Sequence, residues 1–191
     1  MFLILTYRRY TTKQCVAVVV GAQQKTYYLY PDLLKAESPF IAAQLKKCWN
    51  PKKDKIEIKN ADPNHFDKIV HWLYTELVPE TLPGVDSTGP AEKIHPVYKL
   101  ADELMMVALQ NDLMDKLILY LRNSDTNITF YGLAQIAKLQ LQHTPLYLFA
   151  LKNVTRQLMI CPLPDEEMSK QFNALVDSPD TVRDVLLHLN Q

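Results

Sequence analysis

Histidine and cysteine are the residues of this chain whose side chains could support metal binding or acid–base catalysis. The 191-residue sequence has five histidines: His65, His71, His95, His143 and His188. No two of them stand four residues apart, the spacing that places two imidazoles on one helix face, and no H-E-x-x-H motif occurs. We therefore predict histidines that are hydrogen-bonded or solvated, with no metal site and no cofactor.

Cys48 is the candidate for a catalytic nucleophile, with His65 or His71 as its base. The periodicity of this segment places Cys48 on a helix face with Ile41 and Leu45, where a free cysteine behaves as a small hydrophobic residue. The three cysteines of the chain also lack the C-x-x-C spacing of zinc sites. We predict reduced, structural cysteines and no catalytic residue. An enzyme built on Cys48 stays as an alternative.

Basic side chains gather around one predicted turn and are candidates for contacting phosphate groups. They are Lys46, Lys47, Lys52, Lys53 and Lys55, interrupted by Asp54 and Glu57. The whole chain has 21 Lys and Arg against 21 Asp and Glu, so its formal net charge is zero. We interpret the cluster as a solvated turn and predict no nucleic-acid partner and no membrane partner.

Glycine is scarce in this sequence, with four glycines against twelve prolines. Phosphate-binding loops need glycines for positive φ and for close approach of the backbone to a ligand. Neither a P-loop nor a dinucleotide-binding fingerprint occurs. The composition therefore argues against a nucleotide-dependent enzyme, and we predict no small-molecule ligand. With 48% hydrophobic residues and 22% charged residues, the chain should fold.

The chain opens with a short apolar run from Phe2 to Leu5, followed by Arg8 and Arg9. A secretory signal has its basic residues first and then an apolar stretch of about 7 to 15 residues, so the order and the length both differ. No later run approaches the roughly 18 to 20 apolar residues of a membrane span. We expect a protein of the cytoplasm, the nucleus or both.

The first third of the chain predicts a small sheet. Three segments rich in β-branched and aromatic residues are the predicted strands: 15–20, 25–30 and 55–59. Gly21 stands in the turn between the first two, which predicts a hairpin. Alternation in the third segment predicts that Ile56 and Ile58 face inward.

Proline marks the starts of most predicted helices, because its fixed φ suits the first helical position. Pro31 opens the helix 31–37, and capping residues precede Pro39, Pro63, Pro145 and Pro179. The apolar residues that we expect on buried helix faces are Ile41, Leu45, Cys48 and Trp49; Phe66, Ile69, Val70, Leu73 and Tyr74; Val97, Leu100, Ala101, Leu104, Met105 and Ala108; Leu113, Leu117, Tyr120 and Leu121; and Val182, Val185, Leu186 and Leu189. The remaining predicted segments are a loop at 79–93 and helices at 110–121, 130–141, 146–159 and 165–172.

Three blocks of sequence resemble the BTB/POZ domain family. VAVVVGAQQKTYYLYPDLLKAESPFIAAQLKK resembles the family's opening hairpin and first two helices, with Val20-Gly21 and Ser38-Pro39-Phe40 at characteristic positions. IEIKNADPNHFDKIVHWLYT resembles its third strand and the helix that ends in W-L-Y-T, here 72–75. VYKLADELMMVALQNDLMDKL resembles its helical pair, with Ala101-Asp102. The resemblance covers about 15–121 and is closest to stand-alone BTB proteins of filamentous fungi.

The resemblance implies an α+β fold, the BTB/POZ fold, in which a cluster of helices flanks a small three-stranded sheet, with a carboxy-terminal all-helical extension. We divide the chain into an N-terminal tail or exchanged strand at 1–14, a BTB/POZ domain at 15–123 and a helical extension at 124–191. The implied function is protein–protein interaction through self-association and partner docking, with no chemistry of its own.

Three positions depart from the family's pattern. Many animal members have an Asp and a His that form a charged pocket at the dimer interface, and the aligned residues here are Cys15 and Tyr30. The polar pocket associated with co-repressor recruitment is therefore not expected. The glycine that usually follows Y-T is Glu76, so we expect the next turn to differ.

Two interaction surfaces follow from the resemblance. The residues expected in self-association of a homodimer are Phe2, Leu3, Ile4, Leu5, Tyr30 and Leu34, because Phe2–Leu5 resembles a strand that many BTB dimers exchange. A frayed tail, or a strand that pairs within its own chain, explains Phe2–Leu5 equally well. Some BTB domains also dock on a cullin scaffold as ubiquitin ligase adaptors, and the residues expected on that surface are Tyr74, Leu77, Leu82 and Asn111.

Two further functions stay open. One is a small adaptor of the elongin or Skp type, whose helices from Phe130 onward would capture a motif of a partner. The other is a transcription or chromatin-associated regulator that acts through a partner. The neutral charge of the chain gives the second one no support.

Overall fold

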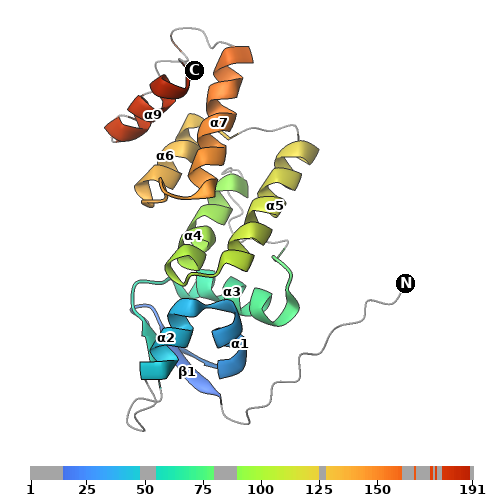
Figure 1. The fold of residues 1–191 in the computed structure, drawn as a ribbon, viewed down its shortest axis with the longest axis vertical. Coiled ribbons are helices and arrows are strands. Elements are labelled where there is room, and N and C mark those ends of the chain that lie inside the picture. Colours follow the sequence, from blue (N-terminus) through green and yellow to red (C-terminus); the bar gives the residue numbers. More distant parts are fainter. Residues whose placement is uncertain are drawn as a thin grey trace, which may run out of the picture. The chain divides into compact units, whose positions relative to one another are not determined.

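The computed structural model describes residues 15–47, 55–79, 90–124, 128–160 and 178–189, together with Glu166, Asn173 and Leu175 (Figure 1). The chain divides into two compact units: a first unit of Met1–Pro79 with Leu100–Gln110, and a second unit of Glu80–Lys99 with Asn111–Gln191. Two helices, α4 (Pro90–Glu103) and α5 (Val107–Ser124), contribute residues to both units. These units differ from the predicted domains, whose boundary lies between residues 123 and 124. The predicted boundary stays a prediction.

The first unit is built on a three-stranded sheet of β1 (Val16–Val20), β2 (Lys25–Leu29) and β3 (Lys55–Ile58). β1 lies in the middle and pairs antiparallel with β2 and parallel with β3. Val18 and Val20 point to the same side of β1 and are completely buried. The predicted hairpin and third strand are confirmed, although Ile58 is only partly buried where Ile56 is buried.

Gly21 closes the hairpin turn in a place where a side chain cannot fit. Its φ is +72°, and a Cβ atom there would lie 2.7 Å from the Ala61 carbonyl oxygen and 3.0 Å from Pro63 Cδ. The Gly21 N–H donates to the Ile58 carbonyl (2.9 Å), and the Gln24 N–H donates to the Gly21 carbonyl (3.1 Å). The hairpin turn, the end of β3 and the chain that follows it therefore meet at one residue.

Three helices of the first unit start at the predicted prolines: α1 (Pro31–Glu37), α2 (Pro39–Lys47) and α3 (Pro63–Thr75). α1 lies beside α2 and α3, and α2 lies beside β3. The Asp62 side chain caps α3 by accepting a hydrogen bond from the Asn64 N–H (2.8 Å). Capping and proline thus act together at the start of this helix, as the sequence predicts.

Ser38 is a buried polar residue that links two parts of the first unit. Its Oγ accepts a hydrogen bond from the Ile41 N–H (3.1 Å), which caps α2, and donates to the Leu104 carbonyl (2.6 Å). One hydroxyl therefore connects the α1–α2 junction with the end of α4. The cap follows from the sequence, but the second bond does not, because its partner is 66 residues away.

α4 begins earlier than predicted, and α5 is longer than predicted. α4 begins at Pro90, inside the segment 79–93 that we expected to be a loop, because proline is well suited to a first helical position. α5 runs from Val107 to Ser124, whereas the apolar pattern predicted 110–121. The part of the loop prediction at residues 80–89 lies outside the described residues.

The end of α4 corrects the predicted buried face. Met105 has φ +56°, the Met106 N–H donates to the Ala101 carbonyl (2.8 Å), and the Met105 N–H donates to the Asp102 carbonyl (2.9 Å). These two bonds form a Schellman motif, which ends the helix. Met106 is buried as a result, whereas Met105 and Ala108 are exposed, so their predicted burial is wrong.

The second unit contains α6 (Phe130–Lys138), α7 (Pro145–Ile160) and α9 (Pro179–Leu189), and α7 lies beside both of the others (Figure 1). Thr129 caps α6 by accepting from the Gly132 N–H (3.1 Å). Tyr147 on α7 donates its hydroxyl hydrogen to Asp184 on α9 (2.8 Å). Burial and the neighbouring Asp184 carboxylate raise the pKa of Tyr147 to about 12, so the phenol remains a donor at neutral pH.

Three helices end in a left-handed residue that is not glycine. Glu76 follows α3 at φ 55°, Met105 follows α4 at φ 56°, and Gln140 follows α6 at φ 61°. All three side chains are exposed, so the cost of the conformation is backbone strain without a clash in the core. Glu76 therefore takes the conformation that glycine adopts most readily, and the expected change of turn at this position stays a prediction.

Several predicted helix faces are slightly rotated in the structure. On α3, Phe66, Ile69 and Leu73 are buried as expected, but Trp72 is buried where Tyr74 is exposed. Other residues whose predicted burial is wrong are Tyr120 and Leu186, which are exposed. Cys48, Trp49 and most of the predicted helix 165–172 lie outside the described residues. Among the described helices, none combines the length and the apolar character that crossing a membrane requires.

His95, on the part of α4 in the second unit, is buried without a polar partner. Its side chain is 1% exposed, and neither ring nitrogen has a hydrogen-bond partner among the described residues. Burial disfavours the charged imidazolium and lowers the pKa of His95 to about 4. The expectation that each histidine is hydrogen-bonded or solvated is wrong here.

We predict that the second unit loses stability in mild acid because of His95. The unfolded imidazole has its ordinary pKa of 6.5, so the unfolded state binds more protons than the folded state between that value and about 4. The free energy of unfolding therefore falls as the pH falls through this window, by about 3 kcal/mol in total. Urea unfolding at several pH values measures the slope.

The matched variants are His95→Leu and His71→Leu. His71 is exposed on α3, so its replacement should leave the acid slope as it is in the parent chain. His95→Leu should flatten the slope between about pH 6.5 and pH 4. An acid slope that is the same in all three chains would show that another group is responsible.

Candidate interaction surface

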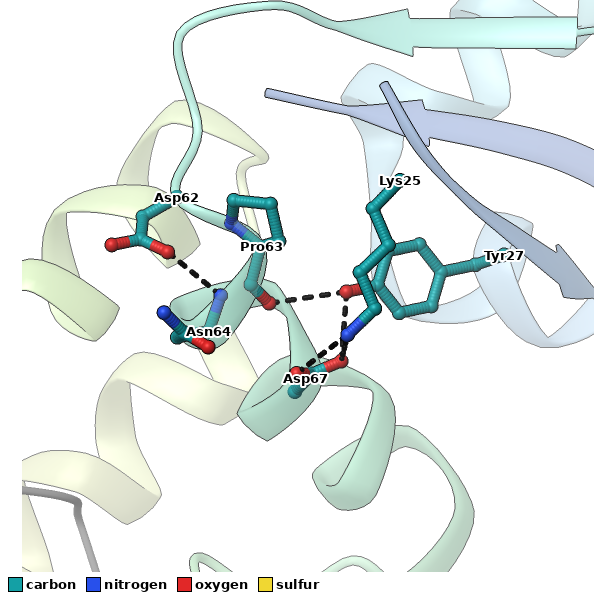
Figure 2. Close-up of polar contacts among 6 residues, drawn as sticks. All are labelled: Lys25, Tyr27, Asp62, Pro63, Asn64 and Asp67. Carbon is teal, nitrogen blue, oxygen red and sulfur yellow. Dashed lines mark hydrogen bonds and ion pairs between the residues drawn. The ribbon is translucent and has the colours of Figure 1, made fainter. Parts of the chain in front are cut away.

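Two side chains of β2 hold the amino-terminal part of α3 (Figure 2). The Tyr27 hydroxyl lies 2.7 Å from Asp67 Oδ1 and 3.1 Å from the Pro63 carbonyl oxygen, and its single hydrogen is shared between these two acceptors. Lys25 Nζ donates to both carboxylate oxygens of Asp67 at 2.9 Å. Strand and helix are therefore joined by several hydrogen bonds that meet at one carboxylate.

Ring contacts reinforce this junction. The Tyr27 ring packs edge-on against Phe66, with ring centroids 4.9 Å apart and an interplanar angle of 61°. Lys25 Nζ lies 5.1 Å from the centroid of the same Tyr27 ring. Phe66 is completely buried, so the tyrosine connects the exposed polar cluster with the core of the first unit.

The charges in this cluster are the ordinary ones at neutral pH. Partial burial raises the pKa of the Asp67 carboxyl, but the hydrogen bonds from Lys25 and Tyr27 outweigh it, so the pKa lies below its usual value. The hydrogen bond to Asp67 raises the pKa of Lys25, and burial raises the pKa of Tyr27. The carboxylate, ammonium and neutral phenol are all in the states that make these bonds.

This arrangement positions a helix and does not resemble an active site. The cluster contains a carboxylate, an ammonium group and a phenol, all engaged with one another, and no activated nucleophile. Within the part of the chain that the structure describes, no three His, Cys, Asp or Glu side chains gather as a metal site would require.

The opposite end of α3 presents apolar side chains to solvent. Tyr74 is 47% exposed and Leu77 is 66% exposed. Thr75 fixes the chain between them, since its Oγ1 donates to the His71 carbonyl (2.8 Å) and accepts from the Leu77 N–H (3.2 Å). The left-handed Glu76 turns the chain at the same point. Leu77 is therefore held in a defined place although it lies beyond the helix.

The structure brings together two of the four residues expected on a cullin surface. Tyr74 and Leu77 lie near each other at the end of α3 in the first unit. Asn111 is exposed on α5 and belongs to the second unit. Leu82 lies outside the described residues.

Of the residues expected in self-association, the structure describes Tyr30 and Leu34. Phe2–Leu5 lies outside the described residues. Tyr30 is the residue before α1 and is partly exposed. Leu34 is 1% exposed, so its side chain belongs to the core of the first unit. An interface near α1 would have to use exposed residues around Leu34 and not Leu34 itself.

The connection between α4 and α5 presents exposed apolar residues that the sequence reasoning missed. Met105 and Val107 both point to solvent, on either side of the buried Met106. Leu104 and Met106 are both buried, and the left-handed Met105 between them ends α4. The sequence pattern gives no signal for this break, because periodicity does not decide which of the two adjacent methionines is buried.

Comparison with known proteins identifies the class that this sheet and these helices define. The family model of the BTB/POZ domain matches residues 9–120, which is more than half of the chain. The chain therefore belongs to the BTB/POZ domain family. This family membership defines a protein–protein interaction module and confirms the expected fold class. No curated protein matches the sequence.

Two solved structures are similar to part of this chain. The BTB domain of human gigaxonin is 20% identical over 52% of this chain and 74% of that chain, with a TM-score of 0.41. The BTB domain of zebrafish PATZ1 is 16% identical over 55% of this chain and 76% of that chain, with a TM-score of 0.43.

Proposed function

We propose that this chain is a non-enzymatic adaptor that forms homodimers and docks a cullin-type scaffold of a ubiquitin ligase, in the cytoplasm or the nucleus. Membership of the BTB/POZ family supports the general part, because BTB domains self-associate and bind protein partners. Beyond family membership, we propose a particular partner, the cullin-type scaffold, and a particular docking surface. The elongin-like adaptor and the chromatin-associated regulator stay predictions.

The exposed apolar end of α3 is the observation that carries the cullin proposal. Tyr74 and Leu77 present apolar area to water, although Thr75 holds the backbone between them in one conformation. Exposed apolar side chains on an ordered backbone are typical of the anchors in protein interfaces, because little backbone ordering is needed on binding. The hydrogen bonds from Lys25 and Tyr27 to Asp67 hold the other end of the same helix.

Self-association is proposed through the segment Phe2–Leu5 of each copy. The segment is rich in β-forming residues, and a strand exchanged between copies would reduce the number of open sheet edges. β2 and β3 are the edge strands of the described sheet and offer backbone donors and acceptors for such pairing.

We predict that the full chain is a dimer and that a chain starting at Thr11 is a monomer. The truncation removes Phe2–Leu5 and leaves the described elements intact. Light scattering coupled to gel filtration measures the mass. A truncated chain with the dimer mass would contradict strand exchange, and a monomeric full chain would contradict self-association.

We predict that Leu77→Asp weakens binding of a cullin N-terminal region about tenfold or more, since it places a charge in the apolar anchor. Co-elution and calorimetry with the purified scaffold measure this. Because Leu77 is exposed, the variant should keep the far-UV circular dichroism and the mass of the parent chain.

Leu187→Asp is the matched control. Leu187 is exposed on α9 in the second unit, so its replacement should leave cullin binding unchanged. A parent chain that never binds the scaffold, or a Leu77→Asp variant that binds it like the parent, would overturn the cullin proposal.

A further inference from the structure

The outward face of α7 carries two basic side chains between apolar ones. Its exposed residues after the first turn are Leu148, Lys152, Arg156, Met159 and Ile160. At 3.6 residues per turn they form one stripe, about 18 Å long from Leu148 to Ile160. The opposite side of the helix is buried, and its residues there are Leu146, Tyr147, Ala150, Leu151, Val154 and Leu158.

No described residue neutralises the cations of this stripe. Lys152 and Arg156 form no ion pair with any side chain in the described parts of the chain. The polar residues beside them are used elsewhere: the Ile128 N–H donates to Asn153 Oδ1 (3.1 Å), and Gln157 Nε2 donates to the Ile128 carbonyl (3.2 Å). The stripe is therefore separate from the polar network that holds the residue before the α6 cap, Ile128, to α7.

Large apolar side chains at both ends of the stripe are exposed to solvent. Met159 is 57% exposed, Ile160 is 71% exposed, and Leu148 at the other end is 48% exposed. Large apolar side chains gathered on one helix face, together with polar neighbours, are typical of a surface that binds another protein.

A second copy of the chain is a poor occupant for this face. A symmetric antiparallel pair of α7 helices would place Lys152 and Arg156 of one copy against the same cations of its partner. Like charges in contact cost several kcal/mol at an interface. Self-association through α7 is therefore disfavoured by charge.

An anionic membrane is also a poor occupant. Two cations near a charged bilayer contribute about 2 kcal/mol together, and this chain has no net positive charge to add. The exposed residues form a single row and not a broad basic surface. A protein partner with a single row of complementary side chains fits the stripe better than a membrane does.

We propose that the stripe Leu148, Lys152, Arg156 and Ile160 binds an amphipathic helix of a partner protein that carries two acidic residues between two apolar ones at four-residue spacing. The apolar side chains of the two helices would pack at both ends of the contact. The carboxylates would pair with Lys152 and Arg156, and burial between the apolar ends would strengthen these pairs. This surface lies on the second unit and does not depend on cullin binding.

The probe is a blocked helical peptide of alanine and glutamine that carries leucine, glutamate, glutamate and leucine at successive positions four residues apart. Fluorescence anisotropy with the full chain measures its affinity. We expect binding that weakens with added salt and that falls about tenfold or more in Lys152→Glu/Arg156→Glu. A peptide with lysine in place of both glutamates should bind the reversed variant and not the parent.

Binding of the lysine peptide by the charge-reversed variant would show that the variant is folded and that only its surface charge has changed. Lys46→Glu, at an exposed position of α2, is the matched control and should bind the glutamate peptide like the parent. The proposal is overturned if the parent fails to bind the glutamate peptide or binds both peptides equally. It is equally overturned if phosphatidylserine vesicles bind through Lys152 and Arg156 in place of the peptide, or if the charge reversal changes the mass of the chain in solution.

Discussion

Gly21 lets the hairpin turn lie directly against the chain that enters α3. A Cβ atom would come within 2.7 Å of the Ala61 carbonyl oxygen, and the φ of +72° is itself unfavourable for other residues. The bonds from Tyr27 and Lys25 to Asp67 then hold the amino-terminal part of α3 against β2. Because a helix of 13 residues is rigid over about 20 Å, this junction also sets where Tyr74 at its other end is presented.

Three helix ends of this glycine-poor chain use residues other than glycine in the left-handed conformation. Glu76, Met105 and Gln140 take left-handed conformations with their side chains in solvent, where a Cβ atom meets only backbone strain. Gly21 differs because a Cβ atom there would also collide with a neighbouring carbonyl oxygen. A chain with few glycines can therefore use other residues for exposed helix ends but needs glycine where two segments touch.

Short-range sequence signals predicted most of the helices and strands. The features that they did not predict depend on long-range contacts. Helix starts at Pro39, Pro63 and Pro179 follow from proline with a capping residue, because both act within a few residues of chain. The break at Met105 depends on which of two adjacent methionines the core accepts, and periodicity alone cannot decide that. The exposed anchor at Leu77 was expected only from a family resemblance, and the α7 stripe emerged only once exposure was known.

Unfolding of Gly21→Ala in urea, compared with Gly132→Ala, tests most directly whether the Gly21 contact positions α3. Gly132 lies inside α6, where the added Cβ would meet two side-chain atoms, Ile128 Cγ2 at 3.3 Å and Thr129 Oγ1 at 3.7 Å, and alanine favours the helix. We expect Gly21→Ala to lower the free energy of unfolding by at least about 2 kcal/mol and Gly132→Ala to change it by less than about 1 kcal/mol. A Gly21→Ala chain as stable as the parent would contradict the account.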